Sequence, residues 1–314
     1  MSTVLVVVVG PTGSGKSALS LHLAERFHGE VVNCDSMQLY RGLDIGTGKV
    51  LSAHRGTIPH HMLDVAGPAE FFSAGEYARI VRARLPEISA RGYLPILVGG
   101  TGLYLRALLH GLFEGPPRNE GIRRRLVGLA DAGRLSRLHH WLSRVDHESG
   151  LRIMPRDRLR IIRALEVYLL TGIPLSEHFR TSHQPLEGFR PLWIGLNPPR
   201  EELYARINQR VLDMLATGWI EEVRGLISIG VPPNCQAFAA LGYRQIVEHL
   251  GGKISAEDLV ERIQTATRRY AKRQWTWFRA EPGVKWLEGF GDAPLIQEQA
   301  EIWIRTIQSN LQGL

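Results

Sequence analysis

Residues 10–17, GPTGSGKS, have the residue types and spacing of a phosphate-binding loop, G-x-x-x-x-G-K-[ST]. Glycines let successive backbone N–H groups point at one anion, and the helix that follows adds the positive end of its dipole. The lysine places a full charge on the terminal phosphate, and a hydroxyl at the last position suits a Mg²⁺ ion that bridges two phosphates. The sequence therefore predicts a diphosphate site, with Ser17 as the metal ligand. Its predicted residues are Gly10, Pro11, Thr12, Gly13, Ser14, Gly15, Lys16 and Ser17.

Two more polar residues follow apolar runs that resemble buried strands. Asp35 comes after residues 30–33, and Thr101 comes after residues 93–100. Ligands of open parallel sheets bind across the carboxyl ends of the strands, so we expect both residues near the phosphate-binding loop. A carboxylate there can take a proton from a nucleophile or bind Mg²⁺. The alternative roles are structural: Asp35 caps the next turn, and Thr101 caps the next helix.

The elements that must position these residues are strands and helices in alternation. Residues 3–9 are a β-branched run typical of a strand buried on both faces. Strand, loop and helix then recur in an order that predicts a parallel α/β sheet. Further strands are predicted at residues 30–33, 93–100 and 191–196. Helices are predicted at residues 16–27, 73–91, 102–109, 200–217, 219–229, 237–250 and 255–279.

A second kind of segment interrupts this pattern. Residues 118–163 contain twelve arginines, no lysine and five acidic residues, which accounts for the net charge of +7 of the whole chain. The segment has a helical pattern and no β-branched runs. We therefore predict a helical insertion domain over residues 116–189, with the core domain formed by residues 1–115 and 190–314. A basic surface of this kind indicates a polyanionic partner.

Composition narrows the class of protein. Of the 314 residues, 44% are hydrophobic and 22% are charged, which is typical of a globular protein. The two cysteines, Cys34 and Cys235, have no metal-site spacing, which argues against a zinc site and a disulfide framework. No apolar run is long enough to span a bilayer, so we expect a soluble, cytoplasmic protein.

Seven motifs occur in a family-specific order from the first strand to about Trp286. They are GPTGSGKS, DSMQLYRGLDIGTGK, HHMLDV, LVGGTGLYLRALL, RALEVY, GYRQ and AKRQWTWFR. The set resembles the bacterial tRNA dimethylallyltransferase family, also called tRNA isopentenyltransferases. Two departures are visible: Gly48 and Val50 stand where the family commonly has alanine and proline, and Arg156 stands where it commonly has asparagine.

The resemblance implies a fold and an activity. The expected fold is α/β, with a P-loop NTPase-like core of parallel sheet and flanking helices, plus an inserted all-helical subdomain. The expected reaction transfers a dimethylallyl group from dimethylallyl diphosphate to N6 of an adenosine adjacent to the anticodon, with the target base flipped out and pyrophosphate released. The expected cofactor is Mg²⁺, and the expected partner is a tRNA anticodon stem-loop. We expect a monomer, because the tRNA would occupy much of the surface.

The resemblance also implies roles for residues at the phosphate site. Lys16 and Ser17 correspond to residues that stabilise the leaving diphosphate, with Mg²⁺. Asp35 corresponds to the general base that takes a proton from the adenine amine. Thr101 matches a residue near the reacting centre, so the predicted catalytic set is Asp35, Thr101 and Lys16. Arg206 and Arg210, spaced i, i+4, share a helical face and are predicted to bind the diphosphate; the alternative is a solvated face.

The predicted contacts with tRNA come from six parts of the chain. Residues 35–38 match the family's contacts with the extruded base, and Gln38 carries an amide suited to an adenine edge. The helix predicted over residues 255–279 has six cations and no acid between Arg262 and Arg279, a stripe that either binds RNA or is only solvated. The full predicted set is Asp35, Ser36, Met37, Gln38, Thr101, Arg123, Leu159, Arg160, Ile161, Ile162, Arg163, Gly242, Tyr243, Arg244, Gln245, Arg268, Lys272 and Arg273.

Two other functions share the phosphate-binding loop. A P-loop kinase for a small metabolite would use the same loop and Asp35, but it leaves the basic insertion without a role. An RNA-binding ATPase would use the basic surfaces without transferase chemistry. Both alternatives are nucleotide-binding and predict ATP turnover, whereas a transferase releases pyrophosphate only when dimethylallyl diphosphate and tRNA are both present.

Overall fold

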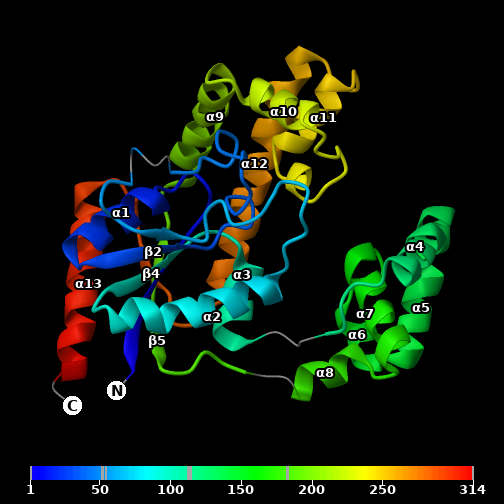
Figure 1. Cartoon of the computed structure of the whole chain (residues 1–314), viewed down its shortest axis with the longest axis horizontal. Coiled ribbons are helices and arrows are strands. Elements are labelled where there is room, and N and C mark those ends of the chain that lie inside the picture. The colour runs from blue at the N-terminus through cyan, green and yellow to red at the C-terminus, as the bar shows by residue number, and fades with distance from the viewer. Residues whose placement is uncertain (1, 51–52, 54, 112–114, 182–183, 313–314) are drawn as a thin grey trace. The chain divides into compact units, whose positions relative to one another are not determined.

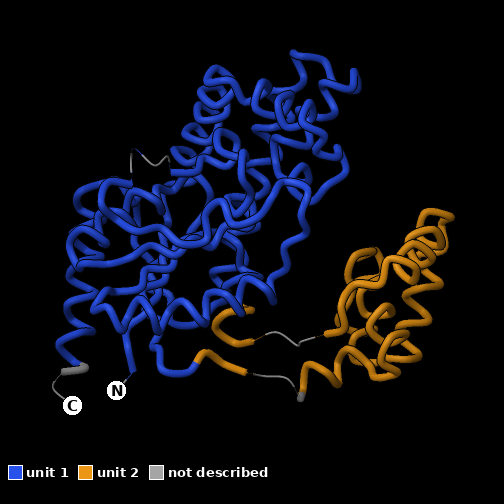
Figure 2. Tube along the Cα trace, in the orientation of Figure 1, with its two compact units in different colours: residues 1–105, 187–314 blue, residues 106–186 orange. Residues whose placement is uncertain are grey.

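The structure is a computed structural model that describes residues 2–50, 53, 55–111, 115–181 and 184–312. Contacts between Cα atoms divide the chain into two compact units, residues 1–105 with 187–314 and residues 106–186 (Figure 2). Within the described residues, no helix combines the length and the apolar composition needed to cross a membrane.

The first unit is built on a sheet of parallel strands (Figure 1). Its strand order is β3-β2-β4-β1-β5-β6, and the described residues contribute six strands. The strands are β1 (Thr3–Val9), β2 (Gly29–Asn33), β3 (His60–His61), β4 (Leu94–Val98), β5 (Phe189–Leu196) and β6 (Lys285–Leu287). The parallel α/β core predicted from the sequence is confirmed.

The register of the central strands brings three chain segments to one edge. Val8 of β1 pairs with Val98 of β4, and Asn33 of β2 pairs with the same Val98. These strands therefore end at the same level, and the segments that follow them leave the sheet side by side. They are the phosphate-binding loop, the segment that contains Asp35, and the turn that contains Thr101.

The core of this unit lies against both faces of the sheet. Along β1, Val4, Val6 and Val8 join an apolar cluster with helices α1 (Lys16–Arg26) and α13 (Pro294–Gln312). Side chains alternate along a strand, so the equally buried Leu5, Val7 and Val9 face the opposite side. Helix α2 (Ala74–Ala90) lies beside β4, and α3 (Gly102–His110) follows the Thr101 turn (Figure 1).

The helices after β5 match the sequence prediction except at one point. They are α9 (Arg200–Ala216), α10 (Trp219–Ser228), α11 (Tyr243–Leu250) and α12 (Ala256–Arg279). The single helix predicted over residues 237–250 is wrong: a short 3₁₀ turn (Ala237–Ala239) precedes α11. Gly242 separates them with φ of 83°, and the indole of Trp219 occupies the space that a Cβ on Gly242 would need.

The second unit has a helical core of its own. It contains α4 (Glu120–Leu129), a π turn (Ala130–Arg134), α5 (Leu135–Val145), α6 (His147–Arg152), α7 (Arg158–Thr171) and α8 (Leu175–Thr181). Leu126, Leu142 and Leu165 are among the buried residues that these helices share. Most of the predicted insertion, residues 116–186, lies in this unit, and residues 187–189 lie in the other.

Candidate active site

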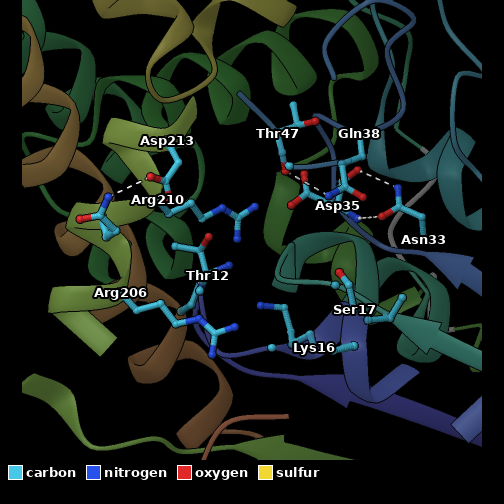
Figure 3. A pocket seen from close by; sticks show the side chains of 18 residues that line it. Thr12, Lys16, Ser17, Asn33, Asp35, Gln38, Thr47, Arg206, Arg210 and Asp213 are labelled. Carbon is cyan, nitrogen blue, oxygen red and sulfur yellow. Dashed lines mark hydrogen bonds between the residues drawn. The ribbon is translucent and has the colours of Figure 1, made fainter. Parts of the chain in front are cut away.

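A cavity of about 460 Å³ lies at the edge where the central strands end. Figure 3 shows that its walls come from the phosphate-binding loop, from the segment after β2, and from α9. The predicted site residues that line it are Thr12, Gly13, Gly15, Lys16, Ser17, Asp35, Gln38, Arg206 and Arg210. The structure therefore brings most of the predicted diphosphate residues together with Asp35 and both arginines of α9, whereas Gly10, Pro11 and Ser14 do not line this cavity.

Lys16 is held over its own loop. Its Nζ donates hydrogen bonds to the carbonyl oxygens of Gly10 at 3.0 Å and of Pro11 at 2.7 Å. Burial lowers the pKa of Lys16 to about 7; the charge of Asp35 opposes this shift and that of Arg210 adds to it. A group with this pKa gains its full positive charge when an anion arrives, which suits a residue that binds phosphate.

The loop is braced by a second turn from the far end of the chain. Gly291 donates its backbone N–H to the carbonyl of Ser14 at 2.9 Å. Gly15 has φ of 86°, and a Cβ there would lie 2.8 Å from the backbone nitrogen of Gly291. The close approach and the left-handed backbone both require glycine at this position.

Asp35 is fixed by hydrogen bonds on either side. Its backbone N–H donates to Oδ1 of Asn33 at 3.1 Å, and its own Oδ1 accepts from the backbone N–H of Met37 at 2.9 Å. The turn-capping role considered for Asp35 is thus present. Among the residues that the structure describes, Oδ2 of Asp35 has no protein donor, so one carboxylate oxygen stays available to accept a proton.

Thr101 lies directly behind the Asp35 segment. Its Oγ1 accepts from the backbone N–H of Ser36 at 3.0 Å, and its backbone N–H donates to the carbonyl of Cys34 at 3.2 Å. These bonds tie the turn after β4 to the residues on both sides of Asp35. In the structure Thr101 therefore contacts the backbone on either side of Asp35.

The two arginines of α9 occupy different settings. Arg206 makes a bidentate ion pair with Asp292, at 2.9 and 2.8 Å, and its guanidinium lies 4.8 Å from the ring centroid of Phe290. Arg210 is half-buried, and burial together with the charge of Arg206 lowers its pKa, against the influence of Asp35. Both side chains extend from α9 toward the phosphate-binding loop (Figure 3). A purely solvated face is therefore a poor description of this part of α9.

A second cavity, of about 320 Å³, adjoins the first. Thr12, Asp35, Thr47 and Arg210 line both. The walls that belong to the second cavity alone are more apolar and include Met37, Ile207, Val211, Met214, Trp219, Leu241 and Tyr270. Asp35 therefore lines two adjoining cavities, of which the smaller is the more apolar although Arg210 and Arg273 also line it.

The GYRQ motif supports this second cavity from behind. Tyr243 is fully buried; its hydroxyl donates to Oε1 of Glu222 and accepts from the backbone N–H of Gly46 at 3.1 Å. Glu222 in turn accepts the N–H groups of Asp44 and Ile45. The prediction that Tyr243 contacts tRNA directly is corrected by this burial: the residue holds the 44–46 loop in place.

The other members of the motif have separate partners. Gln245 accepts the backbone N–H of Gly242 at 2.8 Å and so caps α11. Gly242 packs against the Trp219 ring. Arg244 is exposed and pairs with Glu248 at 3.0 Å. Arg244 is the member of this motif whose side chain lies at the surface.

The predicted residues of the helical unit fall into buried and exposed groups. Ile161 and Ile162 are in its core, which corrects their assignment as direct tRNA contacts. Arg123 and Arg163 both bond Oε2 of the fully buried Glu166, at 3.1 and 3.0 Å. The exposed members are Leu159, at 71%, and the side chain of Arg160, at 70%.

The cations of α12 also differ in their surroundings. Arg268 donates to Oδ1 of Asn208 at 2.6 Å and to Thr265 at 2.9 Å. Arg273 lines the second cavity, with its guanidinium 5.6 Å from the ring centroid of Tyr270. Lys272 is exposed. The stripe is therefore partly used for internal contacts.

Sequence reasoning missed Gln274 of α12. Its side chain is 4% exposed, accepts from the backbone N–H of Thr12 at 2.7 Å, and donates to the carbonyl of Gly100 at 3.1 Å. A signal for it was present, because Gln274 is a polar residue beside Trp275 and Phe278 on the apolar side of the helix.

The donor groups fit a magnesium ion that arrives with a diphosphate. The Ser17 hydroxyl and the Asp35 carboxylate share the larger cavity. The described residues contain no cluster of three His, Cys, Asp or Glu side chains able to hold a metal by itself. Mg²⁺ commonly takes one or two protein ligands and completes its shell with substrate phosphate oxygens and water.

Comparison with known proteins agrees with this site. The model of the family described as IPP transferase matches residues 38–281. A tRNA dimethylallyltransferase from Solibacter usitatus is 50% identical, covering 94% of this chain and 96% of the relative, and one from Koribacter versatilis is 49% identical, covering 96% and 98%.

Solved structures give the same result. The tRNA isopentenylpyrophosphate transferase from Bacillus halodurans has a TM-score of 0.72 at 36% identity and 99% coverage of both chains. A eukaryotic dimethylallyltransferase described as acting on tRNA has a TM-score of 0.78 at 30% identity, covering 98% of this chain and 78% of the other. With the phosphate-binding loop, Asp35 and the arginines of α9 gathered at one strand edge, this chain belongs to the IPP transferase family.

Proposed function

We propose that this protein transfers a dimethylallyl group from dimethylallyl diphosphate to N6 of an adenosine adjacent to the anticodon of tRNA, releasing pyrophosphate. The observation that supports it best is the position of Asp35, which lines both the larger cavity and the smaller, more apolar one. A transfer between two substrates needs such a shared point, because donor and acceptor must meet in reacting geometry. The names of the relatives support the choice of substrates.

In this proposal the diphosphate of the donor binds in the larger cavity. Lys16 and Arg210 compensate its charge, together with backbone N–H groups of the loop and the positive end of α1. Bound Mg²⁺, held by the Ser17 hydroxyl, would supply further charge neutralisation on the leaving oxygens. Arg206, already paired with Asp292, adds charge at the rim of the cavity.

The acceptor base approaches from the smaller cavity. A base in a helical stack cannot reach such a site, so the adenosine leaves its stack before reaction. Ser36 and Met37 line this cavity, and Gln38 lines the other, beside the shared Asp35. As N6 forms a bond to the allylic carbon, the carbon–oxygen bond to the diphosphate breaks and its electron pair leaves with pyrophosphate. Oδ2 of Asp35 takes the proton that N6 loses.

The remaining contacts with tRNA are proposed for exposed basic and apolar side chains. On α12 these are Lys272 and Arg273, and in the helical unit they are Leu159 and Arg160. Arginine and lysine bind phosphates, and apolar side chains contact unpaired bases. We propose a monomer as the acting unit, because a bound tRNA would cover much of the surface.

The test uses purified protein, radiolabelled dimethylallyl diphosphate and an anticodon stem-loop RNA. We expect label in the RNA only when both substrates are present, and none when the target adenosine is replaced by guanosine. ATP hydrolysis measured in parallel separates this function from the kinase and ATPase alternatives. Unlabelled RNA together with rapid ATP turnover would contradict the proposal.

A further inference from the structure

The side chain of Gln274 joins two loops of the active site. Its Oε1 accepts from the backbone N–H of Thr12 at 2.7 Å, and its Nε2 donates to the carbonyl of Gly100 at 3.1 Å. Thr12 belongs to the loop after β1, and Gly100 belongs to the turn after the neighbouring strand β4. The amide thus spans the gap between these loops while lining the larger cavity.

The chemistry of the two partners fixes how the amide is oriented. An N–H group can only donate and a carbonyl can only accept, so the oxygen must face Thr12 and the nitrogen must face Gly100. The backbone also leaves room for this side chain: a Cβ on Gly100 would collide with Nε2 of Gln274. Gln274 is 4% exposed, so water cannot readily replace either bond.

Both bonds act on groups with a place in the proposed reaction. Thr12 lines both cavities, and its N–H is taken by Gln274 instead of being free for a phosphate. Gly100 precedes Thr101, whose Oγ1 accepts from the N–H of Ser36, next to Asp35. Gln274 therefore fixes the position of the phosphate-binding loop relative to the turn after β4, which supports Asp35.

We infer that Gln274 is a positioning residue for the transfer reaction: it holds the bound diphosphate and the carboxylate of Asp35 in register, without touching either substrate's reacting atoms. This inference rests on the function proposed above. A displacement of about 1 Å in a reacting group can lower a rate by about a hundredfold, so a residue that fixes this register acts mainly on kcat.

The variant Gln274→Glu tests the inference because its protonation state changes one bond. A protonated glutamic acid has the shape of glutamine, and its O–H group can donate to the carbonyl of Gly100. The ionised carboxylate has no donor, so it places an acceptor oxygen against the carbonyl oxygen of Gly100 and that hydrogen bond is lost. We expect kcat at neutral pH to fall by about ten- to a hundredfold, with the KM for RNA unchanged. The ratio of variant to wild-type kcat should rise as the pH is lowered.

A matched control lies on the same helix. Gln264 donates its Nε2 to the carbonyl of Asn208 at 3.1 Å, outside both cavities. For Gln264→Glu the ratio to wild-type kcat should not depend on pH. Melting temperatures of both variants show whether each is folded, and Gln274→Ala should lose kcat at every pH.

Two results would overturn the inference: a kcat for Gln274→Glu equal to wild type, or a loss that is independent of pH and matched by the control. Failure of the proposed function is a separate outcome, because wild-type protein would then transfer no label in the same assay.

Discussion

Replacing Asp35 with asparagine removes the proposed base and keeps its shape. Oδ1 of Asp35 accepts the backbone N–H of Met37 at 2.9 Å, and the amide oxygen of an asparagine can accept the same bond, so the turn after β2 should stay in place. The substitution replaces Oδ2, the atom that would take the proton, with an amide NH₂ group, which can only donate. A lost general base lowers the rate by about 10²–10⁴-fold, which corresponds to roughly 2.7–5.4 kcal/mol of transition-state stabilisation. We expect that loss in kcat, with little change in donor affinity.

The assay is single-turnover transfer of label to the stem-loop RNA, with donor affinity measured separately by calorimetry. Asp213 offers a matched control, since its carboxylate lines the same cavity and accepts Nε2 of Gln209 at 2.8 Å. Asp213→Asn should keep kcat within about threefold of wild type, because nothing in the mechanism uses that oxygen. If Asp35→Asn retained wild-type kcat, or if both variants lost it equally, Asp35 would not be the base.

Three further outcomes are expected. Tyr243→Phe should lower the free energy of unfolding by about 1–3 kcal/mol in urea, because Glu222 and the N–H of Gly46 lose a partner; weaker RNA binding at unchanged stability would mean that Tyr243 contacts RNA. Lys272→Glu should weaken RNA binding and reduce the slope of log K against log salt by about one; a wild-type slope would mean a merely solvated side chain. Burial lowers the pKa of Lys16 to about 7, so the charged side chain destabilises the folded state below pH 7, and this destabilisation disappears as the pH rises toward 10. The free energy of unfolding of the wild type should therefore rise over this pH range relative to that of Lys16→Met. Parallel curves of stability against pH for the two proteins would contradict this expectation.

Local pattern was enough to predict the sheet and the shared edge at which the proposed phosphate site lies. The β-branched run of β1, the glycine loop and the helix after it are each specified by neighbouring residues, and a parallel sheet then requires Asp35 and Thr101 at the same edge. Elements with weak local signals were not predicted: β3 has two residues, β6 has three, and α13 follows them. The local sequence predicts Gly242 inside a helix, because its packing partner, Trp219, is distant in sequence.

Resemblance located residues of importance without saying what each one does. Ile161, Ile162 and Tyr243 match positions where the resemblance implies contacts with tRNA, yet their side chains are buried and support their surroundings. Gln274, in contrast, was not predicted to lie at the site. Its partners at Thr12 and Gly100 are far away in sequence, so these contacts are known only from the folded structure. A polar residue on an apolar helix face is functional only if suitable partners face it in the folded protein. The spacing of residues along the sequence does not identify those partners.

The bond between Thr12 and Gln274 joins residues 262 positions apart, and a second bond joins Ser14 to Gly291. During synthesis Thr12 and Ser14 emerge long before these partners, because 262 positions separate Thr12 from Gln274. The earliest motif to be translated is thus among the last to reach its final geometry. Contacts of such separation also form slowly, because a long loop must close before they are made. A truncated chain can carry GPTGSGKS intact and still lack the braces that hold this loop in place.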